Sequence, residues 1–200
     1  MHPHPAFRPE PDADLLAMAE SIGLAHIVVP APGGPLIVHA PITRHGGSVR
    51  FHVARGNPAA DHCDGADLVV AVLGVHGYIS PSWYERPDNQ VPTWNYVAVE
   101  MRGTATAISD DDTVEQLDRL ALLHEPADRP WSRTKMDQHA FAKLLAGIRG
   151  FAIDKPILSA TLKLSQNKTA ADRAGVVAGL TRGGSSLMAQ AVAAGAPISG

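Results

Sequence analysis

The sequence predicts a mainly β fold with peripheral helices, and three observations lead to this class. Short β-branched runs separated by Gly- and Pro-rich turns predict a meander of three strands. Two longer apolar, β-branched runs flank a segment rich in proline and aromatic residues. Apolar residues at helical spacing precede the first strand run and follow the longer ones. The length of 200 residues suits one compact domain, which we place at residues 1–183, followed by an Ala/Gly-rich tail at 184–200.

Each element follows from its local pattern. The predicted strands are Leu24–Val29, Leu36–Thr43, Ser48–Ala54, Asp67–Ile79, Trp94–Ala107 and Gly150–Leu164. The predicted helices are Asp12–Ile22, a helix that opens on three aspartates at 110–112 and reaches His124, Thr134–Ile148, and one that starts near Thr169. Thr169 with Asp172 three residues later is typical of a helix N-terminus. A short helix or turn is expected at Ala59–Gly65, and a weak helix in the tail.

Composition excludes several classes of function. The net charge of −3 does not support a chain that grips DNA phosphates by itself. No apolar run is long enough to span a membrane, and the N-terminus lacks the layout of a signal peptide. A single cysteine, Cys63, excludes an internal disulfide and agrees with a reducing compartment, so a cytoplasmic protein is expected. The ten histidines lack metal-binding spacing, and no nucleophile elbow or P-loop occurs, so neither a metal site nor protein-borne covalent chemistry is predicted.

The segment Val75–Met101 concentrates the large polar aromatic residues. It holds five of the six Trp and Tyr residues, namely Tyr78, Trp83, Tyr84, Trp94 and Tyr96. Its prolines exclude a continuous helix or a central strand between the two flanking strands. Amphipathic rings held on an ordered loop are a usual way to build a binding wall. The alternative is that the rings close one end of a barrel or face another subunit, and composition leaves both interpretations open.

Two polar segments are candidates for ligand contacts. In the strand Ser48–Ala54, Val49, Phe51 and Val53 share one face, and the strand runs into a Gly-Asn-Pro turn beside Arg55. Exposed backbone N–H groups and a guanidinium at a strand end suit an anion. Taken alone, a solvated Arg55 explains the pattern better. The polar residues at 163–167 lie between a strand end and a helix start, where they could hold a planar ligand or only cap the turn.

Four blocks in this order point to a family. They are H-V-A-R-G-N-P at 52–58, Y-I-S-P-S-W-Y at 78–84, V-P-T-W-N-Y-V-A-V at 91–99 and K-L-S-Q-N at 163–167. Together they resemble the PaiB family of FMN-binding negative transcriptional regulators, over about Phe7 to Leu180. The resemblance implies a split β-barrel like that of pyridoxamine-phosphate oxidases, acting as a homodimer in which two subunits form each flavin site.

The resemblance also implies FMN as the cofactor and a set of contacts. Three residues would lie beside the isoalloxazine edge: His39, Ala40 and Pro41. Five would lie near the ribityl phosphate: His52, Val53, Ala54, Arg55 and Asn57. Six would approach from the same or the partner subunit: Ser80, Trp83, Lys163, Ser165, Gln166 and Asn167. The barrel oxidases bring several basic side chains to the phosphate, whereas here 57–59 reads Asn-Pro-Ala, so Arg55 is the nearest cation and weaker phosphate binding is expected.

Three functions therefore compete. The first is an FMN-binding negative transcriptional regulator whose ligand biases its association with other factors or with DNA. The second is an FMN-dependent oxidoreductase of the flavin reductase kind, in which an aromatic wall of Trp83 and Trp94 receives a small planar substrate. The third is a ligand-binding or dimer-forming module without cofactor.

Overall fold

The computed structural model describes residues 2–197, and the chain divides into two compact units. The first unit comprises Met1–Ile22, Leu73–Glu100 and Ser159–Gly200, and the second comprises Gly23–Val72 and Met101–Leu158. Two long strands run through both units: β4 (Asp67–Ile79) and β5 (Thr93–Ala107). Each unit has its own core.

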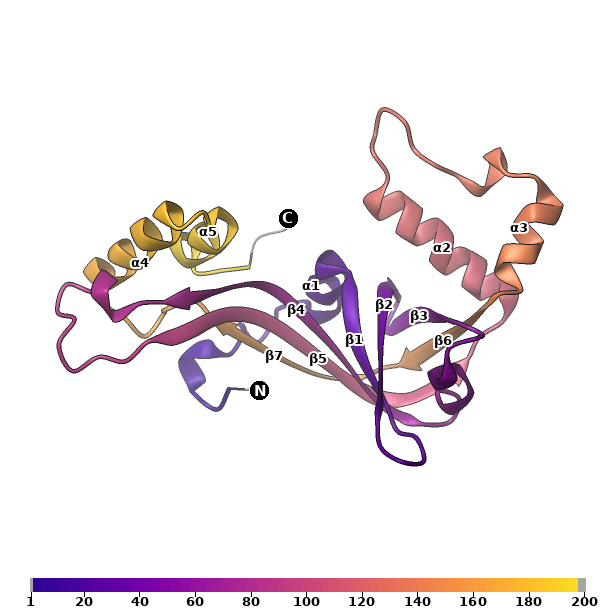
Figure 1. The fold of residues 1–200 in the computed structure, drawn as a ribbon, viewed down its shortest axis with the longest axis horizontal. Helices are drawn as coiled ribbons and strands as arrows, with labels where there is room; N and C mark the ends of the chain where they lie inside the picture. The colour runs from indigo at the N-terminus through magenta and orange to yellow at the C-terminus, as the bar shows by residue number, and fades with distance from the viewer. Residues whose placement is uncertain (1, 198–200) are drawn as a thin grey trace. The chain divides into compact units, whose positions relative to one another are not determined.

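The second unit is built on a ring of antiparallel strands (Figure 1). Besides parts of β4 and β5 it contains β1 (Leu24–Val29), β2 (Leu36–His45), β3 (Ser48–Ala54) and β6 (Ile148–Asp154). The strand order is β4-β1-β2-β3-β6-β5, and β4 also pairs with β5, so the ring closes. Each of these six strands therefore pairs with at least two others along part of its length. The prediction of a mainly β fold with peripheral helices is confirmed.

The ring is split at β2, which changes its partner halfway along. Residues 36–41 pair with β1 and residues 42–45 pair with β3, so the strand belongs to two sheets. The change occurs at Pro41, which has no N–H to donate to a ladder. The next residue, Ile42, donates its N–H to the carbonyl of Gly23 at 2.8 Å. The strand therefore turns from one sheet into the other, as a split β-barrel requires.

The inner face of β3 confirms the alternation predicted from the sequence. Val49, Phe51 and Val53 are buried, whereas the residues between them are partly exposed. Phe51 lies directly opposite Phe151 of β6, and the two rings stack with centroids 5.5 Å apart. This pair anchors the barrel core.

Helices lie at the periphery of the second unit. They are α2 (Asp110–His124), α3 (Gln138–Leu145) and the short 3-10 helices η2 (Pro58–His62) and η4 (Arg133–Lys135). The predicted bounds Thr134–Ile148 are wrong, because Asp137 accepts a hydrogen bond from the N–H of Ala140 and thereby starts a new helix. The prediction of a single strand at 150–164 is also wrong. Lys155 has a φ of 45° and Pro156 lacks an N–H, so the chain breaks into β6 and β7 (Ile157–Lys163).

The first unit packs two helices on a strand ribbon (Figure 1). Its elements are parts of β4, β5 and β7, the 3-10 helices η1 (Pro5–Phe7) and η3 (Pro81–Trp83), and α1 (Leu15–Ile22), α4 (Ala170–Arg182) and α5 (Ser186–Ala194). A Cβ added at Gly77 of β4 would lie 3.3 Å from Met188 and 3.4 Å from Leu180, so the helices cover this face closely. The weak helix expected in the tail is α5, and its buried face holds it on the ribbon. An independent domain at 1–183 stays a prediction.

Within residues 2–197, no helix has the length and apolar character needed to cross a membrane.

Cys63 lies fully buried behind η2. Its thiol donates a hydrogen bond to the carbonyl of Ala59 at 3.2 Å, and burial raises the pKa of the thiol to about 11. Because the thiolate is the reactive form, native protein at pH 8 is expected to resist a thiol reagent such as DTNB, and unfolded protein to react at once. The absorbance of the released thionitrobenzoate checks this, with urea-unfolded chain as the control. Complete reaction of native protein within the mixing time would contradict the buried position.

Candidate functional site

The turn after β3 presents two unused donors. The guanidinium of Arg55 is exposed and makes no hydrogen bond or ion pair with any residue that the structure describes. Asn57 caps η2 by accepting the N–H of Ala59 on Oδ1 at 3.0 Å, which leaves its Nδ2 group without a partner in the described chain. A Cβ added at Gly56 would meet nothing within 4 Å, so the turn is open. We call Arg55, Gly56 and Asn57 the anion seat.

Two other arginines, on β3 and on its neighbour β6, are already paired. Arg50 of β3 contacts Asp112 at 2.9 Å and Glu115 at 3.1 Å, and Arg149 of β6 contacts Asp64 at 3.1 Å. The hydrogen bond from the Ser109 hydroxyl, followed by the charge of Arg50, lowers the pKa of Asp112, so its carboxylate stays charged at neutral pH. Arg50 and Arg149 are thus engaged by acids, whereas the guanidinium of Arg55 has no acidic partner among residues 2–197.

A buried glutamine joins two residues predicted to contact the flavin. Gln116 of α2 is fully buried, its Oε1 lies 2.8 Å from Nδ1 of His52, and its Nε2 donates to the carbonyl of Pro41 at 3.4 Å. Sequence reasoning missed Gln116. The signal was present, because Thr113, Gln116 and Leu120 follow one another at helical spacing and so place a polar side chain on the inner face of the helix.

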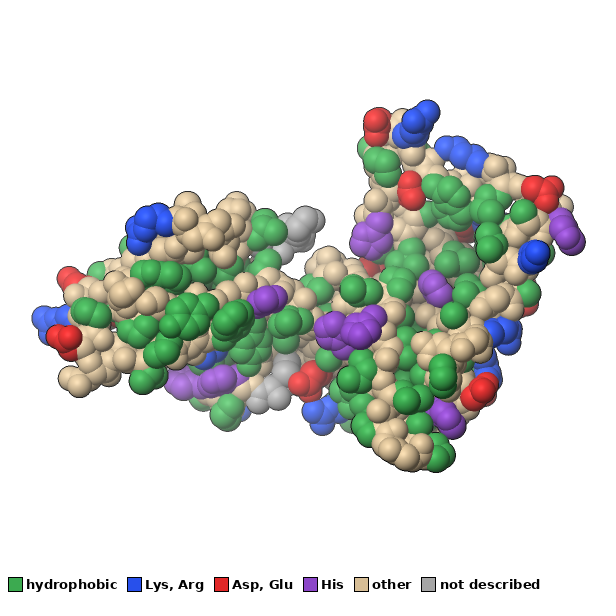
Figure 2. Space-filling model, in the orientation of Figure 1, with side chains coloured by type: hydrophobic (Ala, Val, Ile, Leu, Met, Phe, Trp, Pro, Cys, Tyr) green, Lys and Arg blue, Asp and Glu red, His purple; other side chains and the backbone are tan. Residues whose placement is uncertain are grey.

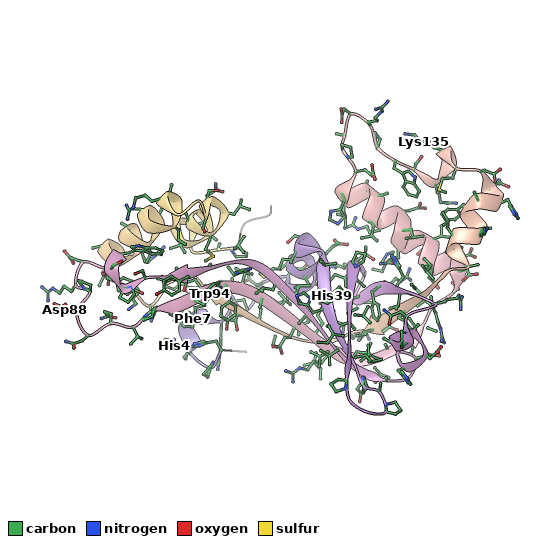
Figure 3. The ribbon with its side chains drawn as sticks, viewed as in Figure 1. His4, Phe7, His39, Asp88, Trp94 and Lys135 are labelled. Carbon is green, nitrogen blue, oxygen red and sulfur yellow. The ribbon has the colours of Figure 1, made fainter. Side chains whose placement is uncertain are left out.

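The remaining predicted residues of the second unit divide by strand face. Ala40 and Val53 point into the barrel core and are buried, so only their backbone could meet a ligand. Ala54 and His39 are exposed. The ring of His39, labelled in Figure 3, lies edge-on to His26 of β1 with centroids 4.8 Å apart. The structure therefore brings the eight predicted residues of this unit onto β2, β3 and the turn that follows β3.

The first unit holds the other six predicted residues. Ser80 caps η3 by accepting the N–H of Ser82 at 3.2 Å. Trp83 packs against α4 so closely that a Cβ at Gly179 would lie 2.3 Å from the indole ring. One side of this indole is therefore covered by helix and cannot serve as an open wall. The sequence signal for this contact is the G-V-V-A-G spacing of Gly175 and Gly179, which sequence reasoning overlooked.

Most polar side chains at 163–167 are already hydrogen-bonded, either within the turn or to β5. Gln166 accepts the N–H of Leu164 at 2.7 Å and donates to the carbonyl of Leu162, so both ends of its amide are used. Ser165 is buried and lies 2.8 Å from the side-chain amide of Asn95. Lys163 donates to Thr93 at 2.5 Å, and desolvation lowers the pKa of its ammonium. Asn167 is the exposed member. These bonds favour a structural role for the segment, in forming the turn and in joining it to β5.

The large aromatic residues separate into a packed and an exposed group. Tyr84 is buried, and the Lys168 ammonium lies 4.3 Å from the centre of its ring. His76, Tyr78 and Trp94 instead form an exposed cluster on β4 and β5, which we call the aromatic face. The indole N–H of Trp94 donates to Nδ1 of His76 at 3.2 Å, and 49% of Trp94 and 48% of Tyr78 stay exposed. Figure 2 shows hydrophobic side chains gathered over this ribbon, and Figure 3 labels Trp94.

Two hollows of the first unit lie away from these residues. One, of about 400 Å³, is lined by α1, β4 and β5, with Ile22 and Val97 among its walls. The other, of about 530 Å³, lies between α4 and α5 and is lined mainly by alanine and valine. None of the residues predicted to bind FMN lines either hollow.

The comparisons with known proteins agree with this architecture. The structure is a split antiparallel β-barrel with an exposed guanidinium and a free amide donor after β3. The chain belongs to the family described as "Putative FMN-binding domain", whose model matches residues 1–154. This assignment confirms the family resemblance and FMN as the family's cofactor.

Relatives extend the match to most of the chain. "Protease synthase and sporulation protein PAI 2" of Bacillus subtilis (strain 168) is 34% identical over 159 residues, which are 76% of this chain and 75% of that protein. Among solved structures, the flavocytochrome Anf3 from Azotobacter vinelandii has a TM-score of 0.58 at 18% identity and covers 76% of this chain and 68% of its own. The FAD and heme binding protein from Mycobacterium smegmatis has a TM-score of 0.53 at 22% identity, covering 75% and 68%. At these identities the two structures show the shared fold.

Proposed function

We propose that the protein is a homodimeric, FMN-binding regulator of the PaiB type, and that the anion seat holds the ribityl phosphate. The observation that carries the proposal is the exposed guanidinium of Arg55, which has no partner among the described residues 2–197, because a cation beside an amide donor at a strand end suits a phosphate. Family membership supplies the identity of the ligand.

The chain's own residues would divide the work of binding. Arg55 and the Asn57 amide would bind the phosphate, and His52, His39 and the backbone of Ala40 and Pro41 would line the rest of the ligand. FMN, when bound, supplies a ring that accepts one or two electrons. A single cation gives one charge-assisted contact, so modest affinity is expected.

Arg55→Ala is expected to weaken FMN binding about 10- to 100-fold, because a hydrogen bond to a charged group contributes roughly 1.5–3 kcal/mol. Quenching of FMN fluorescence on titration with protein measures the dissociation constant. Arg182→Ala is the matched control, since Arg182 is an exposed arginine in the last turn of α4. Equal affinity of the Arg55→Ala and Arg182→Ala variants would remove Arg55 from the phosphate site.

A regulatory role requires an assembly, such as a homodimer or a complex with DNA, whose stability changes when the ligand binds. The aromatic face supports a contact between two copies, since an apolar surface rimmed by polar residues often marks an interface. Sedimentation of the protein with and without FMN tests the homodimer, and a monomer at all concentrations would refute it. Gel-shift experiments at two salt concentrations with the protein's own promoter region test direct DNA binding, which the charge of −3 does not support.

An FMN-dependent oxidoreductase is the second candidate, and the aromatic face is the observation that favours it. Stacked rings held by a hydrogen bond, with half of Trp94 exposed, suit a planar substrate. Anaerobic mixing of the FMN-loaded protein with NADH or NADPH is expected to bleach the flavin absorption if this function holds. No bleaching with either nucleotide would leave the regulator as the better proposal.

A further inference from the structure

We propose that Gln116 fixes His52 as the tautomer protonated on Nδ1, so that Nε2 is presented to the ligand as a hydrogen-bond acceptor. His52 would then recognise a donor group of the ligand, such as a ribityl hydroxyl, and not a phosphate oxygen. Gln116 is a positioning residue in this scheme. The part that concerns the ligand rests on the proposed FMN site, whereas the tautomer does not.

The side-chain amide of Gln116 has one donor end and one acceptor end. The carbonyl of Pro41 can only accept, so the Nε2 group of Gln116 must face it, as the distance of 3.4 Å places it. The opposite orientation would set two oxygens against each other. Because Gln116 is fully buried, water does not compensate for a misplaced amide.

The fixed amide then decides the state of His52. With Nε2 of Gln116 facing Pro41, Oε1 lies 2.8 Å from Nδ1 of His52 and can only accept, so Nδ1 must carry the proton. A neutral imidazole with Nδ1 protonated has its lone pair on Nε2. Isolated histidine prefers the opposite tautomer, so the protein selects the less common form.

The free nitrogen is available to a ligand. Nε2 of His52 makes no hydrogen bond to any described residue, and it is not among the buried polar atoms left without a partner, so it reaches solvent. His52 lies on β3 three residues before Arg55, on the outer face of the strand. Since the phosphate is assigned to Arg55, the acceptor at His52 matches the hydroxyl-bearing part of the same ligand.

The first measurement needs no ligand. Long-range ¹⁵N–¹H correlation spectra of the free protein at pH 8 are expected to show His52 protonated on Nδ1, with His52→Asn identifying the signal by its loss. In Gln116→Leu the signal should change toward the tautomer protonated on Nε2. Thr113→Val is the matched control, because Thr113 is also buried on α2 but bonds within its own helix, to the carbonyl of Ser109. A wild-type signal protonated on Nε2, or no change in Gln116→Leu, would overturn the proposal.

The second measurement separates the inference from the proposed function. Gln116→Leu and His52→Asn are each expected to weaken FMN binding about tenfold, the effect of losing one oriented hydrogen bond, with the double variant no weaker than either alone. Thr113→Val should bind as the wild type does. Equal FMN binding by the wild type and His52→Asn would overturn the role of His52 while the proposed function stands. No FMN uptake by the wild type would overturn the proposed function and, with it, the ligand part of the inference, leaving only the tautomer.

Discussion

Gly175→Ala is expected to lower the free energy of unfolding by about 3 kcal/mol, because the added methyl meets backbone. A Cβ at Gly175 would lie 1.9 Å from the carbonyl oxygen of Trp83, and backbone in η3 cannot rotate away as a side chain can. The helix α4 must therefore lift from η3 or the chain around Trp83 must shift. Urea unfolding followed by circular dichroism measures the loss.

Gly183→Ala supplies the control for this prediction. Gly183 ends the same helix, but a Cβ there would lie 3.5 Å from the nearest atom, an ordinary contact, and its φ of −81° suits any residue. The free energy of unfolding of Gly183→Ala is expected to match that of the wild type within about 0.5 kcal/mol. If Gly175→Ala were as stable as Gly183→Ala, the close packing of Trp83 on α4 would be refuted.

Gly150→Ala is expected to lower the free energy of unfolding by about 2–3 kcal/mol, because the added methyl group would push α2 away from β6. The new Cβ would lie 2.2 Å from the Thr113 hydroxyl and 2.8 Å from the side chain of Ile108, which both pack against β6 at Gly150. Combining it with Thr113→Ala removes the closest clash, so the double variant should be more stable than the sum of the two losses predicts. Thermal unfolding of the four proteins gives this coupling.

Gly47→Ala is the control variant for Gly150→Ala in the second unit. A Cβ at Gly47 would lie no closer than 4.0 Å to a neighbour, so no steric loss of stability is expected. Strict additivity in the double variant would show that Gly150 and Thr113 do not touch. The result also bears on the candidate site, since the same helix carries Gln116 to His52.

Local pattern explains which parts of the fold the sequence predicted. The alternation of Val49, Phe51 and Val53 and the cap at Thr169 depend on neighbouring residues alone, and both are confirmed. The apolar run on both sides of Pro156 predicts one strand, whereas the structure breaks there into β6 and β7. Proline inside a predicted strand should have ended it.

The candidate site was harder to predict, since it depends on contacts between distant segments. Local pattern alone favours a solvated Arg55, and only the family resemblance implies a phosphate contact; the exposed guanidinium is compatible with both. Helical spacing places Gln116 on the inner face of its helix, but its contact with His52, 64 residues away along the chain, requires knowing that α2 covers β3. The bonds that occupy Gln166 and Ser165 were likewise invisible in the sequence.

The change of partner along β2 has a consequence for folding. A strand with a single neighbour can slip by one residue and exchange its inward and outward side chains. Here the first half of β2 is aligned by β1 and the second half by β3, so a slip would have to break both hairpins at once. The two short turns that flank β2 therefore protect each other from misalignment, and β2 acts as the template on which the barrel sets its register.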